Sequence, residues 1–264
     1  MPKMVDPKDL KEDVPNSIPK VSQTVPEEAP IEDNYWEIKD LPSQNRFYGK
    51  IYGRPMKVLD LKKLANMDEN NVTNTIETVL KRCTKGINVN DILTADKLYI
   101  IFWLRYNTFK DKGYEVGFKC SKCGKDTSYH FDLNKLDVTN VDEEKIKKMV
   151  VETSSGTFKL KYQTVGIEKE IEKFMATYSL DPLFDLDEDV VNLSACIDNG
   201  KSLLDNYRML VDMNPIDYKK LEDTLDSISI GVVPLINVAC KLCKEETLLG
   251  ISFRSEFLFP SIQN

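Results

Sequence analysis

The stretch FKCSKCGKDTSYHF, residues 118–131, contains a Cys-x-x-Cys pair formed by Cys120 and Cys123. Residues 114–120 alternate in the manner of a strand, SKCGKD forms a turn, and residues 127–133 return as a second strand. The cysteine pair therefore lies at the tip of a predicted β-hairpin. Because a structural zinc ion takes four ligands, this half-site predicts a second pair elsewhere in the chain.

A second hairpin of the same design begins far along the chain, in LINVACKLCKEETLLGISF, residues 235–253, where Cys240 and Cys243 occupy the turn. Two such hairpins facing each other place four thiolates around one ion, with Zn–S distances of about 2.3 Å. The long intervening segment costs little, since each doubling of a loop adds about 0.6 kcal/mol, whereas structural zinc contributes roughly 10–16 kcal/mol. We therefore predict one structural Zn²⁺ per chain, bound in a split zinc ribbon by Cys120, Cys123, Cys240 and Cys243.

Three other interpretations of the four cysteines stay open: two independent redox pairs, a chance spacing, and an iron–sulfur cluster. A redox Cys-x-x-Cys normally opens a helix, whose N-terminus lowers the thiol pKa, but both pairs here lie between predicted strands. Two symmetrical hairpins favour zinc over an iron–sulfur cluster. His130, the only histidine, is interpreted as a surface residue or a neighbour of the ligands, and Cys83 as a buried thiol.

The whole chain of 264 residues, 41% hydrophobic and 30% charged, is long enough for one large domain or two small ones. Residues 1–34 hold six of the twelve prolines, no aromatic residue, and eight acids against four lysines, which predicts a disordered arm. For residues 35–264, the sequence pattern predicts an α+β fold made of three segments. These are an α/β part with the first zinc knuckle (35–142), a largely helical insert with a β-hairpin (143–232), and the second knuckle with an aromatic tail (233–264).

Helical periodicity predicts helices over 59–67, 70–83 and 94–109, with Thr94 as the N-cap of the third. The third helix is apolar around most of its circumference, which indicates a central position. Within the insert, Ser154-Ser155-Gly156 predicts a hairpin turn, Asn199-Gly200 a helix end, and Asn214-Pro215 a helix start. The acids Asp185, Asp187 and Asp189 lack the Gly and Glu of a calcium loop and indicate a helix N-terminus.

Several classes of protein are disfavoured. A net charge of −7 argues against a nucleic-acid binder, and the lysines near the cysteines are interpreted as offsetting the charge of the zinc–thiolate centre. The longest apolar run, residues 98–104, is too short for a membrane span of about 20 residues. No apolar signal segment is present, which predicts an intracellular protein with reduced thiols. Four thiolates leave no open metal position and no catalytic motif occurs, so we predict no enzymatic activity.

The C-terminal stretch ISFRSEFLFPS carries Phe253, Phe257 and Phe259 close together. Segments near a terminus seldom carry so much aromatic surface unless it is docked. We expect these side chains to dock on the chain's own core or on a neighbouring subunit, and they are the candidate contacts to a partner.

Three stretches together resemble the baseplate hub and hub-assembly proteins of T-even-like contractile-tailed (myovirus) phages. They are LPSQNRFYGKIYGRPMKVLDLKKLA, LYIIFWLRYNTFKDKGYEVGFKCSKCGK and CKLCKEETLLGISFRSEFLFP, and the likeness covers residues 39–132 and 235–260. The resemblance implies a late structural protein that binds other tail baseplate or hub proteins without catalysis. It further implies a place in the virion tail baseplate, or in the host cytoplasm during assembly.

Two other functions remain open at this stage. A zinc-ribbon nucleic-acid-binding or transcription accessory protein would bind DNA or RNA with a steep dependence on salt. An oxidoreductase using its Cys-x-x-Cys pairs would show reversible thiol oxidation and bind no metal.

Overall fold

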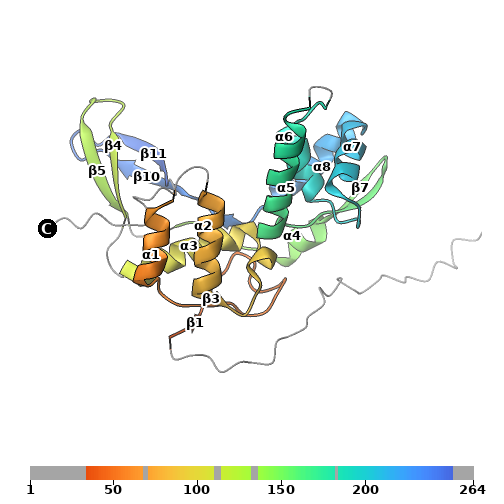
Figure 1. The fold of residues 1–264 in the computed structure, drawn as a ribbon. Helices are drawn as coiled ribbons and strands as arrows, with labels where there is room; N and C mark the ends of the chain where they lie inside the picture. Colours follow the sequence, from red (N-terminus) through yellow and green to blue (C-terminus); the bar gives the residue numbers. More distant parts are fainter. Residues whose placement is uncertain (1–33, 68–70, 110–113, 132–135, 182–183, 252–264) are drawn as a thin grey trace, which may run out of the picture. The chain divides into compact units, whose positions relative to one another are not determined.

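The computed structural model describes residues 34–67, 71–109, 114–131, 136–181 and 184–251. The predicted disordered arm, apart from its last residue, and the three C-terminal phenylalanines lie outside these ranges. The described part is an α+β fold of helices and small antiparallel sheets, as predicted (Figure 1).

The first part of the fold combines a three-stranded antiparallel sheet with three helices. The strands, in sheet order, are β1 (Trp36–Glu37), β2 (Tyr52–Gly53) and β3 (Thr84–Lys85). The helices are α1 (Val58–Ala65), α2 (Val72–Cys83) and α3 (Thr94–Phe109), with a short 3-10 turn, η2 (Val89–Asp91), between the last two. The three predicted helices are therefore confirmed, with ends shifted by at most two residues. Cys83 is buried at the end of α2, as predicted.

Helix α3 is central, as its apolar circumference predicts. Ile100 and Leu104 are buried in the main hydrophobic cluster, and Arg105 is buried with its guanidinium 5.5 Å from the ring centre of Phe109. The predicted N-cap is wrong, because Thr94 is already the first helical residue. Among the described side chains, its hydroxyl is one of three buried groups without a hydrogen-bond partner.

Both predicted cysteine hairpins are confirmed. The first pairs β4 (Tyr114–Lys119) with β5 (Asp126–Phe131), and the second pairs β10 (Leu235–Ala239) with β11 (Glu246–Gly250). In the second hairpin, alternate residues Ile236 and Val238 are buried, whereas Leu235 and Leu248 are exposed. One face of this hairpin therefore packs on the main hydrophobic cluster.

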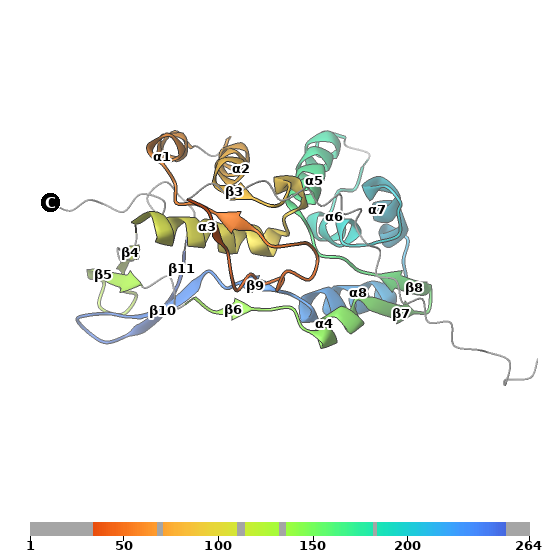
Figure 2. The same cartoon turned by 90° about the horizontal axis from the view of Figure 1, so that it is seen from below.

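Two short strands pair with each other at the two ends of the long segment that separates the cysteine hairpins. Strand β6 (Val138–Thr139) precedes this segment and β9 (Gly231–Val232) follows it, and the two pair antiparallel (Figure 2). The pairing continues with a hydrogen bond of 3.0 Å from the backbone N–H of Val233 to the carbonyl of Asp137. Residues on either side of the long segment are thereby joined next to the second hairpin.

The segment between β6 and β9 contains five helices and one hairpin among its described residues. They are α4 (Glu143–Lys148), β7 (Val150–Thr153), β8 (Gly156–Lys159), α5 (Val165–Tyr178), α6 (Glu188–Ala195), α7 (Leu203–Val211) and α8 (Pro215–Ser227). The hairpin and helices α6–α8 share a hydrophobic cluster that includes Val151, Leu160, Ile197 and Leu221. This segment therefore has buried apolar residues of its own.

Local signals set most helix ends in this segment. Asp187 accepts a hydrogen bond from the backbone N–H of Val190 as the N-cap of α6, and Asn214 caps α8 in the same way ahead of Pro215. The predicted helix end at Asn199-Gly200 is wrong, since α6 already ends at Ala195. The cause is a tertiary contact, because Ile197 forms an isolated β-bridge with Leu160.

Candidate metal centre

The tips of the two cysteine hairpins have the same backbone hydrogen bonds. In the first tip, Cys120 donates to Lys125 at 3.0 Å and accepts from Gly124 at 2.9 Å. In the second tip, Cys240 donates to Glu245 at 2.8 Å and accepts from Lys244 at 2.9 Å. The residue after the second cysteine is left-handed in both, with φ of 67° at Gly124 and 62° at Lys244. The same turn is thus built twice, from sequences that share little beyond the cysteines.

The tips bring the four predicted ligands together. The sulfur atoms of Cys120, Cys123, Cys240 and Cys243 all lie within 4.8 Å of one another. Cys120 Sγ is 3.6 Å from Cys243 Sγ, and Cys123 Sγ is 3.8 Å from Cys240 Sγ, so each close pair joins the two hairpins.

These distances fit a tetrahedral metal site. For Zn–S bonds of about 2.3 Å, the edge of a regular tetrahedron of sulfur atoms is about 3.8 Å. A disulfide requires an S–S distance near 2.05 Å, and all four cysteines are free thiols. The donor set and its spacing therefore match what a four-thiolate zinc site requires, and the described residues contain no other such metal-ligating cluster.

The backbone at each tip favours the thiolate form of the first cysteine. The amides of Cys123 and Lys122 lower the pKa of Cys120. The amides of Cys243 and Leu242 lower the pKa of Cys240 to about 6. Because the thiolate rather than the thiol binds a metal, these amides prepare both cysteines for coordination.

The thiol of Cys243 shows that the clustered sulfur atoms disfavour one another's negative charge when no cation lies between them. The amide of Glu245 lowers the pKa of Cys243, but burial and the neighbouring sulfur atoms outweigh it and raise the pKa to about 11. Sulfur atoms this close disfavour four simultaneous negative charges. A divalent cation at their centre removes this repulsion.

Polar contacts also join the two hairpins outside the sulfur cluster. Lys122 Nζ is 2.8 Å from Glu245 Oε2, and Lys241 Nζ is 3.3 Å from Ser128 Oγ. His130 is exposed on β5 and is not part of the cluster, in keeping with its interpretation as a surface residue. The candidate partner residues Phe253, Phe257 and Phe259 lie outside the described part of the chain.

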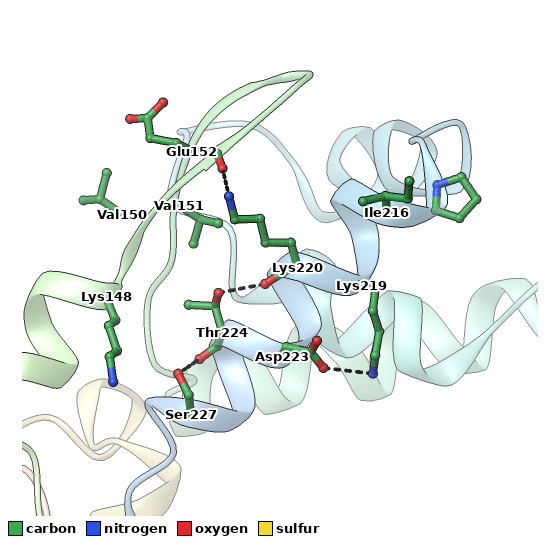
Figure 3. A pocket seen from close by; sticks show the side chains of 11 residues that line it. Lys148, Val150, Val151, Glu152, Ile216, Lys219, Lys220, Asp223, Thr224 and Ser227 are labelled. Carbon is green, nitrogen blue, oxygen red and sulfur yellow. Dashed lines mark hydrogen bonds and ion pairs between the residues drawn. The ribbon is translucent and has the colours of Figure 1, made fainter.

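A second feature, a groove of about 930 Å³ between β7 and α8, was not predicted (Figure 3). Its apolar lining includes Val150 and Ile216, which come from elements far apart in the sequence. No local pattern connects these residues, so only the packing of the hairpin against α8 reveals the groove.

Within the ranges that the structure covers, no helix combines the length and the apolar character needed to cross a membrane.

Comparison with known proteins identifies the family. The family model described as T4 bacteriophage base plate protein matches residues 34–252, which include all four clustered cysteines. Neither the curated proteins nor the solved structures give a match. The chain therefore belongs to the family of T4 bacteriophage base plate proteins.

Proposed function

We propose that this protein is a non-enzymatic structural or assembly component of the phage tail base plate hub, which works by docking other proteins on a scaffold held by one zinc ion. Membership of the base plate family indicates a structural role, a location in the virion tail, and contacts with other base plate proteins. The observation that carries the zinc part is the group of four sulfur atoms within 4.8 Å, supplied by two hairpins of matching geometry.

Cys120, Cys123, Cys240 and Cys243 would hold the ion, which when bound supplies a cross-link between β4–β5 and β10–β11. Four thiolates fill a tetrahedral shell and leave no position for a reactive water molecule, so the site suits a structural role. The consequence is a fixed spatial relation between two hairpins that are distant in the sequence.

The assignment to the hub rests on the motif resemblance over residues 39–132 and 235–260. We propose Phe253, Phe257 and Phe259 as contacts to a hub partner, because aromatic side chains contribute strongly to protein interfaces. On this proposal the chain is made late in infection, in the host cytoplasm, and joins the base plate there.

The first experiment measures metal content and base plate association of the full chain. We expect about one zinc ion per chain and co-purification with base plate proteins when the neighbouring tail genes are co-expressed. Cys240→Ser removes the zinc and lowers co-purification, whereas Cys196→Ala, a buried cysteine outside the cluster, preserves both.

The outcomes separate the parts of the proposal. A metal-free chain with unchanged stability and partner binding would contradict the zinc scaffold. A chain that is absent from purified tails and binds no base plate protein would contradict the docking role. Cross-links found only to proteins at the base plate periphery would contradict the hub.

A further test addresses the C-terminal aromatic residues. Replacing Phe257 and Phe259 by Ser is expected to reduce co-purification with hub proteins by at least about tenfold, with zinc content unchanged. Unchanged co-purification would show that the partner contacts lie elsewhere on the chain.

A further inference from the structure

Two close sulfur–sulfur contacts in the cysteine cluster share one pattern of exposure. Cys120 and Cys240, the first cysteines of their hairpins, are buried, whereas Cys123 and Cys243 are partly exposed. The contacts are Cys123 Sγ to Cys240 Sγ at 3.8 Å and Cys243 Sγ to Cys120 Sγ at 3.6 Å. Each contact therefore joins the accessible sulfur of one hairpin to the buried sulfur of the other.

Interactions outside the cluster favour the same arrangement of the two hairpins. Phe118 of the first hairpin and Val238 of the second pack against the main hydrophobic cluster. At the tips, Lys122 Nζ lies 2.8 Å from Glu245 Oε2. None of these contacts involves a sulfur atom, so they remain available while the sulfur atoms change their bonding partners.

A disulfide within one hairpin meets an obstacle that a disulfide between hairpins avoids. In the first tip, the N–H of Cys120 donates to the carbonyl of Lys125 and the N–H of Gly124 donates to the carbonyl of Cys120. The second tip has the same two hydrogen bonds. Only two residues separate the cysteines of each pair, and so short a loop is stiff. Closing it to the S–S distance of about 2.05 Å is expected to strain the turn.

We propose that this cluster is a peroxide-sensitive redox site, in which oxidation replaces the metal cross-link by two disulfides between the hairpins, Cys123–Cys240 and Cys120–Cys243. The inference rests on the proposed zinc scaffold and concerns its regulation. Disulfides within each hairpin would leave β4–β5 and β10–β11 unconnected once the metal is lost. Disulfides between them keep the hairpins joined, so the oxidised chain retains the surface that it offers to partners.

The first disulfide forms in two steps. The sulfur of accessible Cys123 attacks one oxygen of hydrogen peroxide. An S–O bond forms, the O–O bond breaks, and the leaving hydroxide takes a proton from solvent to become water. The sulfur of Cys240 then attacks the sulfenic acid of Cys123, so that the S–S bond forms, the S–O bond breaks and a second water leaves. The two cysteines lose two electrons, which the peroxide gains. Cys243 and Cys120 react in the same way with a second peroxide.

The test maps the disulfides of the zinc-loaded full chain after oxidation. The protein is treated with about two equivalents of hydrogen peroxide, one for each disulfide. The remaining thiols are then blocked, and the chain is digested with trypsin at mildly acidic pH for mass spectrometry. Trypsin cleaves after Lys122 and Lys241, which lie between the cysteines of each pair. Every cysteine of the cluster therefore falls on its own peptide, and each pairing has its own mass.

We expect the Cys123–Cys240 and Cys120–Cys243 peptides to exceed the pairs within each hairpin by at least about tenfold, because strain in the turn opposes the latter. Zinc release, measured in the same samples, should rise together with these two products. Reduction with a dithiol and addition of zinc should restore the metal content.

Two further measurements complete the comparison. Cys83 and Cys196 are buried outside the cluster, so they should stay reduced and serve as internal controls. Hydrogen exchange of the four hairpin strands in the oxidised chain should stay within about threefold of the zinc-loaded value, because the cross-links limit opening of the hairpins.

Several results would overturn the proposal. They are disulfides within the hairpins, a cluster that stays reduced while Cys83 or Cys196 is oxidised, and oxidation to sulfinic acids without disulfides. A chain that purifies without zinc contradicts the zinc scaffold. A chain that holds zinc but forms disulfides within its hairpins contradicts only the present proposal, so the two failures are distinguishable.

Discussion

At the scale of single residues, the two hairpin tips differ at one position that controls backbone strain. Gly124 and Lys244 both have φ near 60°, a left-handed conformation. Glycine adopts it without steric cost, whereas other L-residues lose roughly 1–2 kcal/mol. The second tip therefore holds a lysine in a conformation that suits glycine.

Lys244→Gly is therefore expected to stabilise the zinc-loaded protein by up to about 1 kcal/mol, since relief of strain exceeds the added freedom of the unfolded chain. Gly124→Ala is expected to destabilise it by about 1 kcal/mol or more. Urea unfolding measures both. Gly49→Ala serves as the control, because the added methyl group meets nothing within 4 Å. A destabilising Lys244→Gly would show that the lysine side chain contributes more than the strain costs.

Asp60 is the most completely paired carboxylate of the first part of the fold. Its side chain is fully buried and accepts hydrogen bonds from Arg54 at 2.9 Å, Arg82 Nε at 2.5 Å and the backbone N–H of Lys57 at 2.9 Å. Burial alone would raise its pKa, but these three donors outweigh that effect and lower it from 3.8 to about 2. The charged form of Asp60 is therefore favoured by folding.

The lowered pKa predicts a dependence of stability on pH. The contribution of Asp60 is complete above the unfolded pKa of 3.8 and is lost as the pH falls through the folded value of about 2. Asp60→Asn is expected to cost roughly 3 kcal/mol near neutral pH, because it leaves Arg54 without its counter-charge, and this difference shrinks between about pH 4 and pH 2. Urea unfolding at several pH values measures it, with exposed Asp226→Asn as the control. A pH-independent difference would contradict the assignment.

Signals from single residues predicted correctly that the four cysteines come together. They predicted some helix caps correctly and others wrongly. The four predicted ligands share a spacing and a hairpin setting, from which the sequence predicts that their sulfur atoms lie close together, as they do. Asn214-Pro215 is likewise a local signal, and it was correct. Thr94 was wrong as a cap, because the carbonyl of Leu93 already accepts a helical hydrogen bond from the backbone N–H of Lys97, so that Thr94 lies inside the helix.

At the scale of elements, Asp217 fastens the β7–β8 hairpin to the first turn of α8. Its carboxylate accepts hydrogen bonds from the backbone N–H and hydroxyl groups of Ser154 and Ser155, at 2.6–3.1 Å. These donors lower the pKa of Asp217 to about 2. The two serines form the hairpin turn, so this contact sets the angle between hairpin and helix.

Asp217→Ala is expected to loosen that turn without unfolding the chain. Hydrogen exchange of the Ser154 amide should accelerate by about tenfold or more, because it loses its acceptor, and that of Ser155 by less, because its amide keeps the contact to Thr153 Oγ1 at 3.2 Å. Exposed Asp223→Ala on the same helix should leave these amides unchanged. Equal exchange rates in the two variants would show that the turn is held by other contacts.

Elements with strong local patterns were predicted, and very short ones were not. Helices α1–α3 and the cysteine hairpins follow from apolar periodicity over five residues or more. Strands β6 and β9 have two residues each, which is too short for a pattern, and they form only because the chain returns to the same place. The end of α6 was misplaced for a similar reason, since the bridge from Ile197 to Leu160 is a tertiary contact.

At the scale of the whole described unit, the proposed metal site and the hydrophobic cluster of the segment between β6 and β9 involve different residues. The cluster of Val151, Leu160, Ile197 and Leu221 contains no residue of the cysteine hairpins. On the proposed zinc scaffold, metal removal should release β4–β5 and β10–β11 first.

Chelation is therefore expected to raise hydrogen exchange in the four hairpin strands by at least about tenfold, given the binding energy of structural zinc. The amides of α6–α8 should keep their protection. Mass spectrometry of exchanged peptides before and after chelation, and after zinc is restored, measures this. Uniform loss of protection along the chain would show that the metal controls the entire fold, and no loss would contradict a structural metal.

The sequence predicted the α+β class and the closeness of the four cysteines. It did not predict the groove or the pairing of β6 with β9. The proposed division of the chain at residues 142 and 232 stays a prediction. The groove depends on how β7 packs on α8. The sequence of neither element alone predicts this packing.

The separation of the two cysteine pairs also has a consequence for the order of events on the ribosome. Cys240 follows Cys123 by 117 residues, and synthesis at about 5–20 residues per second takes roughly 6–23 s to cover that distance. During this interval the first pair has no partner thiols and is open to oxidation or to the wrong ion. On the proposed zinc scaffold, the yield of metal-loaded protein is therefore expected to depend on whether the first pair is kept reduced until Cys240 and Cys243 have been synthesised.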